Sequence, residues 1–292
     1  MSTFDIEAYL AARKALVDRS LERYLKESKQ RPRTIVKAMR YGVLAGGKRL
    51  RPILTLACGE LFGGQRKRLL PFACALELIH AYSLIHDDLP ALDNDDLRRG
   101  APASHKVFGE GMALLAGDAL LTEAFDLMSR TDTVRSLKPG LVLELIHDIA
   151  QAAGASGLVG GQAVDLEAED TETDLETVES IHARKTGALI CVSATVGARL
   201  GGATPQELSR VERYGRTLGL AFQIADDIMD AVDRAHEGSE KKKATYPSVA
   251  GPGAARERAR KLLDRCLKEL DPFGKDADPL RGIARTTVER AL

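Results

Sequence analysis

Residues 86–100 read HDDLPALDNDDLRRG, and this stretch is the most informative part of the chain. Five aspartates fall within ten positions, and Arg98 and Arg99 follow them. Carboxylates at this density repel one another and lose hydration where they face a cavity. A hard divalent cation relieves both penalties, and ligands that are all oxygen select ions such as Mg²⁺. Arginines beside such a site indicate that the metal also binds an anion such as phosphate.

The helix that leads into this stretch is predicted to end at it. His80, Leu84, Asp87 and Asp88 recur at helical spacing and share one face. The proline at position 90 disfavours helical geometry at the residue before it, so the helix is expected to end there. Carboxylates at a helix C-terminus oppose the helix dipole by about 0.3–1 kcal/mol each. A bound cation therefore explains these acids better than helix stability does.

A second acid group, DDIMD at residues 226–230, has the same character. Gln223, Asp226, Asp227 and Asp230 fall at i, i+3, i+4 and i+7, which places them on one helical face. An apolar stripe runs beside that face, formed by Leu218, Phe222 and Ala225. One acid group alone is most simply a solvated charged face, but two of them, one followed by arginines, favour metal binding. An EF-hand is excluded because no loop has its pattern of acids around a glycine.

Three further segments carry basic groups. The segment GGKRLRP places Lys48, Arg49 and Arg51 on a turn before a helix, where charge-assisted hydrogen bonds can hold a diphosphate. A solvated basic loop is the alternative. Lys185 precedes an apolar run, and a lysine directed toward the core is costly unless it meets an anion. A lysine that snorkels to the surface is the alternative. The lysine run 241–243 is weak by itself, because such surface runs are common.

Helical periodicity dominates the whole chain, and alternating strand patterns are absent. Ala, Leu, Glu and Arg, which favour helices, are abundant. No linker rich in Pro, Gly or Ser divides the sequence, so one domain over residues 1–292 is expected. The sequence therefore predicts an all-α bundle of about ten or more helices. They are expected at about residues 6–25, 32–45, 52–62, 66–89, 109–129, 139–153, 174–200, 205–232, 253–270 and 277–291.

Composition excludes several classes of partner. The 42 basic and 42 acidic residues give no net charge, which argues against bulk attraction to nucleic acid or an anionic membrane. The longest uncharged run, residues 187–198, is shorter than the ~20 residues that span a bilayer, so no membrane span is expected. The four cysteines are far apart and form no CxxC pair, as expected of reduced cysteines in a cytoplasmic protein.

Taken together, these residues resemble the short-chain trans-prenyl (polyprenyl) diphosphate synthases of isoprenoid biosynthesis. The two acid groups, in this order within an all-α chain, are the most specific part of the resemblance. Other landmarks follow in order through most of the chain: Gly47–Pro52, His80, Gly117-Asp118, Gly160-Gly161-Gln162, Lys185-Thr186, Phe222-Gln223 and Lys243–Pro247.

The resemblance implies an all-α fold around a deep central cavity, usually in a homodimer. It also implies three Mg²⁺, or Mn²⁺ in their place, which bind the diphosphate of an allylic substrate such as dimethylallyl or geranyl diphosphate. The implied metal ligands are Asp87, Asp88, Asp93, Asp226, Asp227 and Asp230. The implied ligands of the allylic diphosphate are Arg98, Lys185 and a lysine of the run 241–243, with Lys243 as the candidate. Those of isopentenyl diphosphate are Lys48, Arg51, His80 and Arg99.

The chemistry of such an enzyme suits these residue types. The leaving diphosphate develops negative charge, which divalent ions and cationic side chains stabilise. The allylic cation left behind needs a dry apolar pocket with a few fixed dipoles nearby. Thr186 and Gln223 are expected to supply such dipoles, and Lys185 its backbone carbonyl. The isopentenyl double bond attacks and a proton is then lost, and no protein base is needed if the departed diphosphate accepts that proton.

The floor of the cavity is expected to set the length of the product. Tyr82 and Ser83 lie five and four residues before Asp87, about one turn deeper at ~1.5 Å per residue. A tyrosine there is expected to block growth early. With four residues between Asp88 and Asp93, the pattern resembles the bacterial farnesyl diphosphate type. Geranyl and geranylgeranyl diphosphate are the alternative products, and the alternative for Tyr82 is that it only packs in the core.

One departure from the family pattern follows the second acid group. The family usually has a longer loop there, with a Gly-Lys pair that clamps the allylic diphosphate. Here only twelve residues, 231–242, separate Asp230 from Lys243, and the Gly-Lys pair is missing. The role of each lysine in the run 241–243 is therefore left open.

Three other functions fit parts of the pattern. An HD-type phosphohydrolase would use His86 and Asp87 as a metal doublet, but it needs further histidines, and neither His182 nor His236 neighbours such a carboxylate pattern. A non-catalytic subunit of a synthase is expected to have lost one acid group, whereas both are intact. A terpene cyclase shares the ionisation chemistry but has no need of the basic site for isopentenyl diphosphate.

Overall fold

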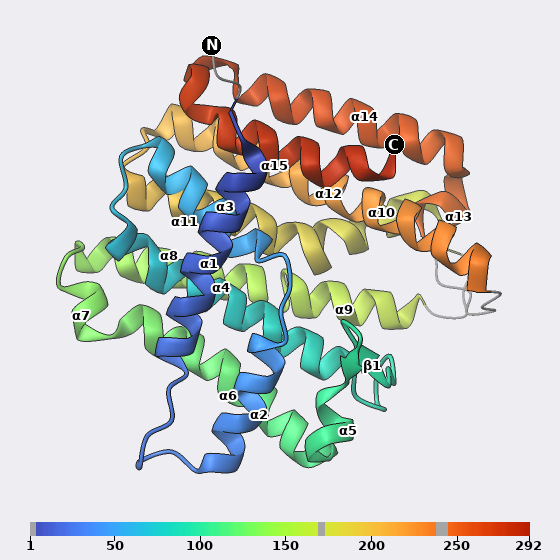
Figure 1. Ribbon diagram of the computed structural model, residues 1–292. Coiled ribbons are helices and arrows are strands. Elements are labelled where there is room, and N and C mark those ends of the chain that lie inside the picture. Colours follow the sequence, from blue (N-terminus) through green and yellow to red (C-terminus); the bar gives the residue numbers. More distant parts are fainter. Residues whose placement is uncertain (1–3, 169–172, 238–244) are drawn as a thin grey trace. The chain divides into compact units, whose positions relative to one another are not determined.

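The computed structural model describes residues 4–168, 173–237 and 245–292 (Figure 1). Most of these residues are helical. The only strands among them, β1 (Leu97–Arg98) and β2 (Ala101–Pro102), form one short antiparallel hairpin. The prediction of an all-α fold is confirmed.

Two compact units make up the chain, and each is described by itself. The N-terminal unit comprises Glu7–Leu56 and Gln65–Ile146. The C-terminal unit comprises the residues before Glu7, Ala57–Gly64 and His147–Leu292. The expected single domain over residues 1–292 stays a prediction.

Helix α4 forms the core of the N-terminal unit and packs most extensively against α6. The side chains of Phe72, Leu76, Leu78 and Ile79 on α4 are fully buried. The helices with most of their residues in this unit are α1 (Ile6–Tyr24), α2 (Arg33–Leu44), α3 (Leu50–Leu61), α4 (Arg66–Asp87), α5 (Ser104–Phe108), α6 (Glu110–Ser129), α7 (Thr131–Val134) and α8 (Pro139–Ala153).

By length and composition, α4 is the one helix of the described residues that could cross a membrane. However, 83% of its most apolar window is buried inside the structure. A core helix of a globular protein has the same composition, because all its faces meet apolar neighbours. The helix therefore gives little support to a membrane span.

Helix α12 is the centre of the C-terminal unit. It packs against α11 and α14, and in Figure 1 α14 and α15 (red) lie beside it. Tyr214 of α12 is fully buried and donates a hydrogen bond to the carbonyl of Leu280 in α15 (2.8 Å). The elements are α9 (Leu158–Glu167), α10 (Leu175–Ile181), η1 (His182–Gly187), α11 (Ala188–Gly201), α12 (Pro205–Glu237), α13 (Tyr246–Ala250), α14 (Pro252–Glu269), η2 (Asp271–Ala277), α15 (Asp278–Val288) and η3 (Glu289–Ala291).

The helix expected over residues 174–200 is not continuous. It is interrupted by η1, a π-helical segment that separates α10 from α11. π-Helical segments are rare and occur frequently at functional sites. Helix α9 and the hairpin were not predicted, whereas α4 ends at Asp87, two residues before the expected end at Leu89.

Candidate functional site

The first acid group surrounds the C-terminal end of α4. Asp88 caps this helix and is only 2% exposed. Arg98 donates to Oδ1 of Asp88 through both Nε (2.8 Å) and Nη2, and to Asp95 through Nη2 (3.1 Å). Burial raises the pKa of Asp88, and the hydrogen bonds from Arg98 offset this only in part. Arg98 therefore compensates a carboxylate that is costly to bury alone.

The turn between β1 and β2 sets the directions of Arg98 and Arg99. Arg99 and Gly100 form the two-residue loop and have positive φ values of 55° and 76°, which suits the primed turns of tight hairpins. Arg98, before the turn, reaches Asp88, and Arg99 donates through Nη1 to the carbonyl of Gly46. The hairpin thus joins the acid group to the basic turn before α3.

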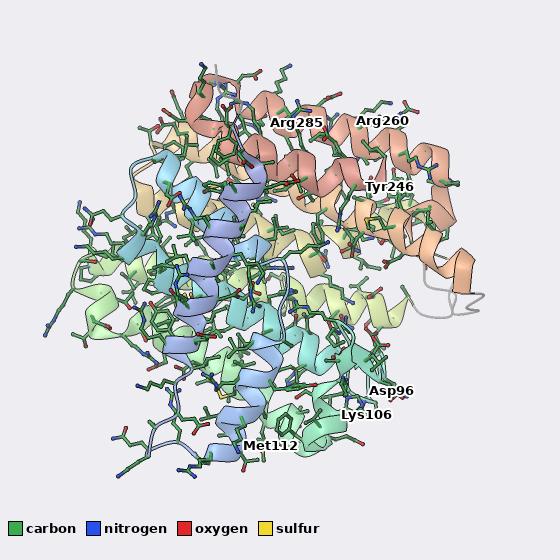
Figure 2. The ribbon with its side chains drawn as sticks, in the orientation of Figure 1. Asp96, Lys106, Met112, Tyr246, Arg260 and Arg285 are labelled. Atoms are coloured by element: carbon green, nitrogen blue, oxygen red, sulfur yellow. The ribbon has the colours of Figure 1, made fainter. Side chains whose placement is uncertain are left out.

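The outer acids of the stretch have cationic partners as well. Lys106 of α5 lies 2.7 Å from Asp96 (Nζ to Oδ1), and both are labelled in Figure 2. The hydrogen bond from Lys106 lowers the pKa of Asp96. At the inner end, the backbone N–H of Asp93 donates to the carbonyl of Asp87 (2.9 Å). The loop is therefore folded back onto the end of α4.

A basic cluster lies in the same unit, formed by the buried Arg51, the half-buried His80 and the exposed Arg99. Burial and, to a smaller extent, the charge of Arg99 lower the pKa of Arg51 to about 10, although Glu77 opposes them. Burial and the charges of Arg51 and Arg99 hold the pKa of His80 well below its usual value. Nε of Arg51 is buried and has no hydrogen-bond partner within the described ranges. An anion at this cluster would satisfy that donor and offset the mutual repulsion of the cations.

Arg49 has a structural role instead. Its guanidinium is buried and donates to Glu77 (Nη1, 2.8 Å), to Asp18 (Nε, 2.8 Å) and to the carbonyl of Val43 (Nη2, 2.7 Å). All three hydrogen-bonding edges are therefore occupied. Of the cations on the GGKRLRP segment, Arg49 holds the turn in place, and Lys48 and Arg51 remain the candidates for substrate binding.

The second acid group lies on α12, and a network of hydrogen bonds connects it to η1. Thr186 donates to Oε1 of Gln223 (2.8 Å), and Nε2 of Gln223 donates to Oδ1 of Asp227 (3.2 Å). Oδ2 of Asp227 accepts from the backbone N–H of Tyr246 (2.8 Å) and lies 3.2 Å from Nε2 of His182. Asp227 is 5% exposed, so these contacts fix a buried carboxylate.

The other polar groups of this site have partners too. Lys185 lies 2.6 Å from Asp165 of α9, and Nη2 of Arg290 donates to Oδ1 of Asp226 (2.9 Å). The guanidinium of Arg290 also lies over the ring of Phe222, 5.7 Å from its centroid. A Cβ atom at Gly161 would lie 2.3 Å from the backbone nitrogen of Lys185. Only glycine therefore lets α9 approach η1 so closely.

The expected floor residues lie on the turn of α4 before the acids. Tyr82 is 6% exposed, and its ring meets that of His86 edge to face with centroids 5.7 Å apart. The hydroxyl of Ser83 donates to the carbonyl of His80 (3.0 Å). Burial raises the pKa of Tyr82, so its hydroxyl stays neutral. The structure places Tyr82 and Ser83 in the packed part of α4, and their role in product length stays a prediction.

The position of His86 disfavours the HD-type phosphohydrolase. Its Nε2 lies 3.0 Å from the carbonyl of Leu114, which suits an N–H donor and leaves this nitrogen unsuited to a metal. The close approach depends on Gly117, where a Cβ atom would lie 2.0 Å from Nε2 of His86. The Gly117-Asp118 landmark therefore marks the contact of α6 with α4.

The two acid groups differ from a ready-made metal site but have the donor atoms for one. No group of three or more His, Cys, Asp and Glu side chains in residues 4–168, 173–237 and 245–292 is arranged to hold an ion. The donor chemistry nevertheless fits Mg²⁺, because each acid group offers hard carboxylate oxygens. In both groups one aspartate already has a cationic partner, because Arg98 pairs with Asp88 and Arg290 pairs with Asp226. Lys243, the candidate clamp, lies outside the described residues.

His182 and Arg290 contact the second acid group but were not among the predicted site residues. His182 stands three positions before Lys185, and the π-helical turn brings it to Asp227, which a regular helical reading does not reveal. Arg290 lies at the far end of the chain, where no local pattern marks it. Both could be found only from tertiary structure.

Comparison with known proteins agrees with this arrangement. A family model described as polyprenyl synthetase matches residues 32–275. The chain belongs to the polyprenyl synthetase family. Relatives match nearly the whole length of the chain. A farnesyl diphosphate synthase of Geobacillus stearothermophilus is 46% identical over 302 residues, covering 99% of each chain. A dimethylallyltranstransferase of Fischerella ambigua is 45% identical, covering 99% of this chain and 85% of its own length.

Solved structures give the same family assignment. The apo crystal structure of an FPP/GFPP synthase from Zymomonas mobilis has a TM-score of 0.88 and 41% identity to this polyprenyl synthetase, covering 97% of this chain and 98% of its own. A geranyltransferase from Legionella pneumophila has a TM-score of 0.89 at 32% identity, covering 98% and 97%. Both the fold and the family are therefore shown over nearly the whole chain.

Proposed function

We propose that this polyprenyl synthetase condenses isopentenyl diphosphate with dimethylallyl or geranyl diphosphate, releasing diphosphate and giving farnesyl diphosphate. The observation that carries the proposal is the basic cluster of Arg51, His80 and Arg99, in which Arg51 is buried. Desolvation lowers the pKa of all three groups, and Nε of Arg51 has no partner among the described residues. Such a cluster is costly unless an anion such as the diphosphate of isopentenyl diphosphate binds there.

The two acid groups are proposed to bind the metal that carries the allylic diphosphate. Three Mg²⁺, or Mn²⁺, would neutralise the diphosphate as it leaves. The candidate ligands are Asp87, Asp88 and Asp93 in one unit and Asp226, Asp227 and Asp230 in the other. Asp88 and Asp227 are buried, and each takes part in several hydrogen bonds or ion pairs.

The residues of η1 are proposed to stabilise the allylic cation. A hydrogen bond to Gln223 fixes the hydroxyl of Thr186, and a hydrogen bond to Asp227 fixes Gln223. The dipoles of the Thr186 hydroxyl and the Gln223 amide are therefore oriented before substrate binds. The ammonium of Lys185, 2.6 Å from Asp165, would bind the allylic diphosphate together with Arg98 and Lys243. The released diphosphate would accept the proton lost after condensation, so no protein base is assigned.

The farnesyl product is proposed from the tyrosine one turn before the first acids. The farnesyl diphosphate synthase of Geobacillus stearothermophilus, at 46% identity, supports this product. Relatives named for the longer geranylgeranyl product also occur, such as the synthase of Cyanophora paradoxa at 43% identity, and they favour geranylgeranyl diphosphate as the second candidate. The length of the wild-type product distinguishes the two.

Assembly as a homodimer in the cytoplasm is also proposed. On the N-terminal unit, the leucines Leu114 and Leu115 of α6 and Leu143 of α8 are exposed, the last at 69%. Exposed apolar side chains mark an interface where they form a contiguous patch, and such a patch is proposed for these leucines. All four cysteines are free, as expected in a reducing compartment. Light scattering on the purified protein tests the dimer.

The experiment that tests the proposed function is product sizing. The protein is incubated with isopentenyl diphosphate and Mg²⁺ together with a C5, C10 or C15 allylic diphosphate. We expect the C5 and C10 primers to be elongated to C15, and the C15 primer to be a poor substrate. An enzyme that elongates none of the three would contradict the proposal and favour a non-catalytic subunit.

A further inference from the structure

A groove of about 770 Å³ lies in the C-terminal unit and belongs to no part of the site described above. It is lined by the end of α8, the turn before α9, η1, α11, α12 and α14. None of the metal or cation-stabilising candidates lines it. Its volume is within the range of roughly 300–1,000 Å³ that small-molecule sites occupy.

The walls of this groove carry an excess of positive charge, although the chain as a whole has none. Asp148 and Glu212 are the acids of its lining, and each pairs with an arginine (Arg199 at 2.5 Å and Arg216 at 2.6 Å). Five arginines line it: Arg184, Arg199, Arg216, Arg258 and Arg265. Arginine guanidinium groups match the geometry of phosphate oxygens, so this excess favours a phosphorylated ligand.

Two of these arginines have no acidic partner among the described residues. Arg258 pairs with Glu179 outside the groove (3.0 Å). Arg184 on η1 and Arg265 on α14 have no acidic partner in the part of the chain that the structure describes. They therefore add two unneutralised charges, one from each of two different elements.

Part of the lining of the groove is apolar, and some of these apolar residues are small. Ala152, Gly157, Ala183, Gly187 and Ala188 leave the space open. The larger apolar side chains that line it are Val192, Leu208, Leu220 and Leu262. A groove lined by both arginines and apolar side chains suits an amphiphile, with its anionic head at the arginines and its hydrocarbon tail against the apolar side chains.

The groove and the candidate catalytic network meet the same π-helical segment. Ala183, Arg184 and Gly187 of η1 line the groove, whereas Thr186 of η1 holds Gln223. A Cβ atom at Gly219 would lie 2.6 Å from Cα of Gly187, so η1 and α12 are in direct backbone contact. A ligand that restrains η1 from the groove would therefore restrain Thr186 as well.

We propose that this groove binds an anionic amphiphile, with a phosphate or diphosphate head and a short hydrocarbon tail, and that the bound ligand alters activity through η1. The second half of this statement rests on the proposed function. The first half does not, and it is tested without turnover.

Cys191 reports occupancy of the groove directly. It lines the groove and is half-buried, whereas the other three cysteines are buried. Burial raises its pKa to about 11, so alkylation with iodoacetamide is followed by mass spectrometry at mildly alkaline pH. The probe is decyl phosphate in Mg²⁺-free buffer, with decanol as the uncharged counterpart. Calorimetric titration of decyl phosphate gives the same comparison should alkylation of Cys191 prove too slow.

The variants are the double substitution Arg184→Gln/Arg265→Gln and the control Arg260→Gln. Arg260 is an exposed arginine on α14 that does not line the groove (labelled in Figure 2). We expect decyl phosphate to protect Cys191 saturably in the wild type and the control. We expect the double variant to bind at least about tenfold more weakly, because charge-assisted hydrogen bonds are lost. Absent protection, equal protection by decanol, or unchanged affinity of the double variant would overturn the site.

The regulatory half has its own readout. The rate of prenyl transfer at saturating substrates is measured with and without decyl phosphate in the same three proteins. We expect a change in rate that the double variant loses and Arg260→Gln keeps. Protection of Cys191 without any such change would overturn the coupling through η1 and leave the binding site in place.

Discussion

At the scale of single residues, burial decides which charged groups hold the structure and which await a ligand. Arg49 and Arg51 are two positions apart, and both are buried. Arg49 has three acceptors, whereas Nε of Arg51 has none in the described ranges. The sequence placed both on one basic turn but could not separate these roles, because the acceptors of Arg49 come from α1, α2 and α4.

The first prediction concerns Tyr82. Tyr82→Ala removes a large side chain one turn before Asp87, so the main product is expected to lengthen from C15 toward C20. Tyr82→Phe keeps the ring and is expected to leave the product at C15. Chromatographic sizing of the prenyl products measures both. An unchanged product profile for Tyr82→Ala would remove this residue from the floor.

The second prediction concerns His80 and pH. Its pKa in the folded protein lies well below 6.5, because burial and the charges of Arg51 and Arg99 disfavour the imidazolium. Below pH 6.5 the unfolded chain therefore binds a proton that the folded chain does not, and stability falls as the pH decreases. The slope approaches about 1.4 kcal/mol per pH unit for one such group.

Urea unfolding at pH 7, 6 and 5.5 measures this slope in the wild type and in His80→Gln, which has no titrating ring. We expect the variant to lose less stability than the wild type as the pH falls. Identical losses in the two proteins would show that His80 does not carry the effect.

At the scale of elements, close backbone approaches set the positions of the site helices. The contacts of α6 with α4 and of α9 with η1 depend on Gly117 and Gly161, because a Cβ atom at either position would meet His86 or Lys185. Both glycines were visible as landmarks in the sequence, but their physical reason appears only when the facing element is known. The interruption at η1 was missed because a helix with one π-helical turn keeps nearly the same apolar periodicity.

The third prediction tests one of these contacts. Gly117→Ala would place Cβ 2.0 Å from Nε2 of His86, so α6 or the ring must move beside the acid group. We expect a loss of about 1–3 kcal/mol of stability together with reduced activity. Gly111→Ala on the same helix meets open space and is expected to keep activity and gain about 0.5–1 kcal/mol. Thermal unfolding and steady-state assays compare the two; equal behaviour would contradict the close contact.

At the scale of the whole molecule, the sequence predicted the all-α class and most helix boundaries, because helical periodicity extends through the chain. It also picked out the acids, since their density has no structural purpose. It could not predict that arginines from distant segments, Arg98 and Arg290, would stand against Asp88 and Asp226. Such pairings depend on tertiary folding, and local patterns do not encode them.

The central claim of the proposed function is that the two acid groups act on the same metal-bound diphosphate. A double-mutant cycle on kcat/KM for the allylic substrate tests it most directly, with Asp87→Ala, Asp226→Ala and the double variant assayed over a range of Mg²⁺ concentrations. Groups that share one ligand are expected to be coupled, with an interaction energy of about 0.5–3 kcal/mol. The account predicts that each single substitution lowers kcat/KM strongly and that the double variant loses much less than the product of the two effects. Effects that simply multiply, or a single variant with wild-type activity at every Mg²⁺ concentration, would contradict it.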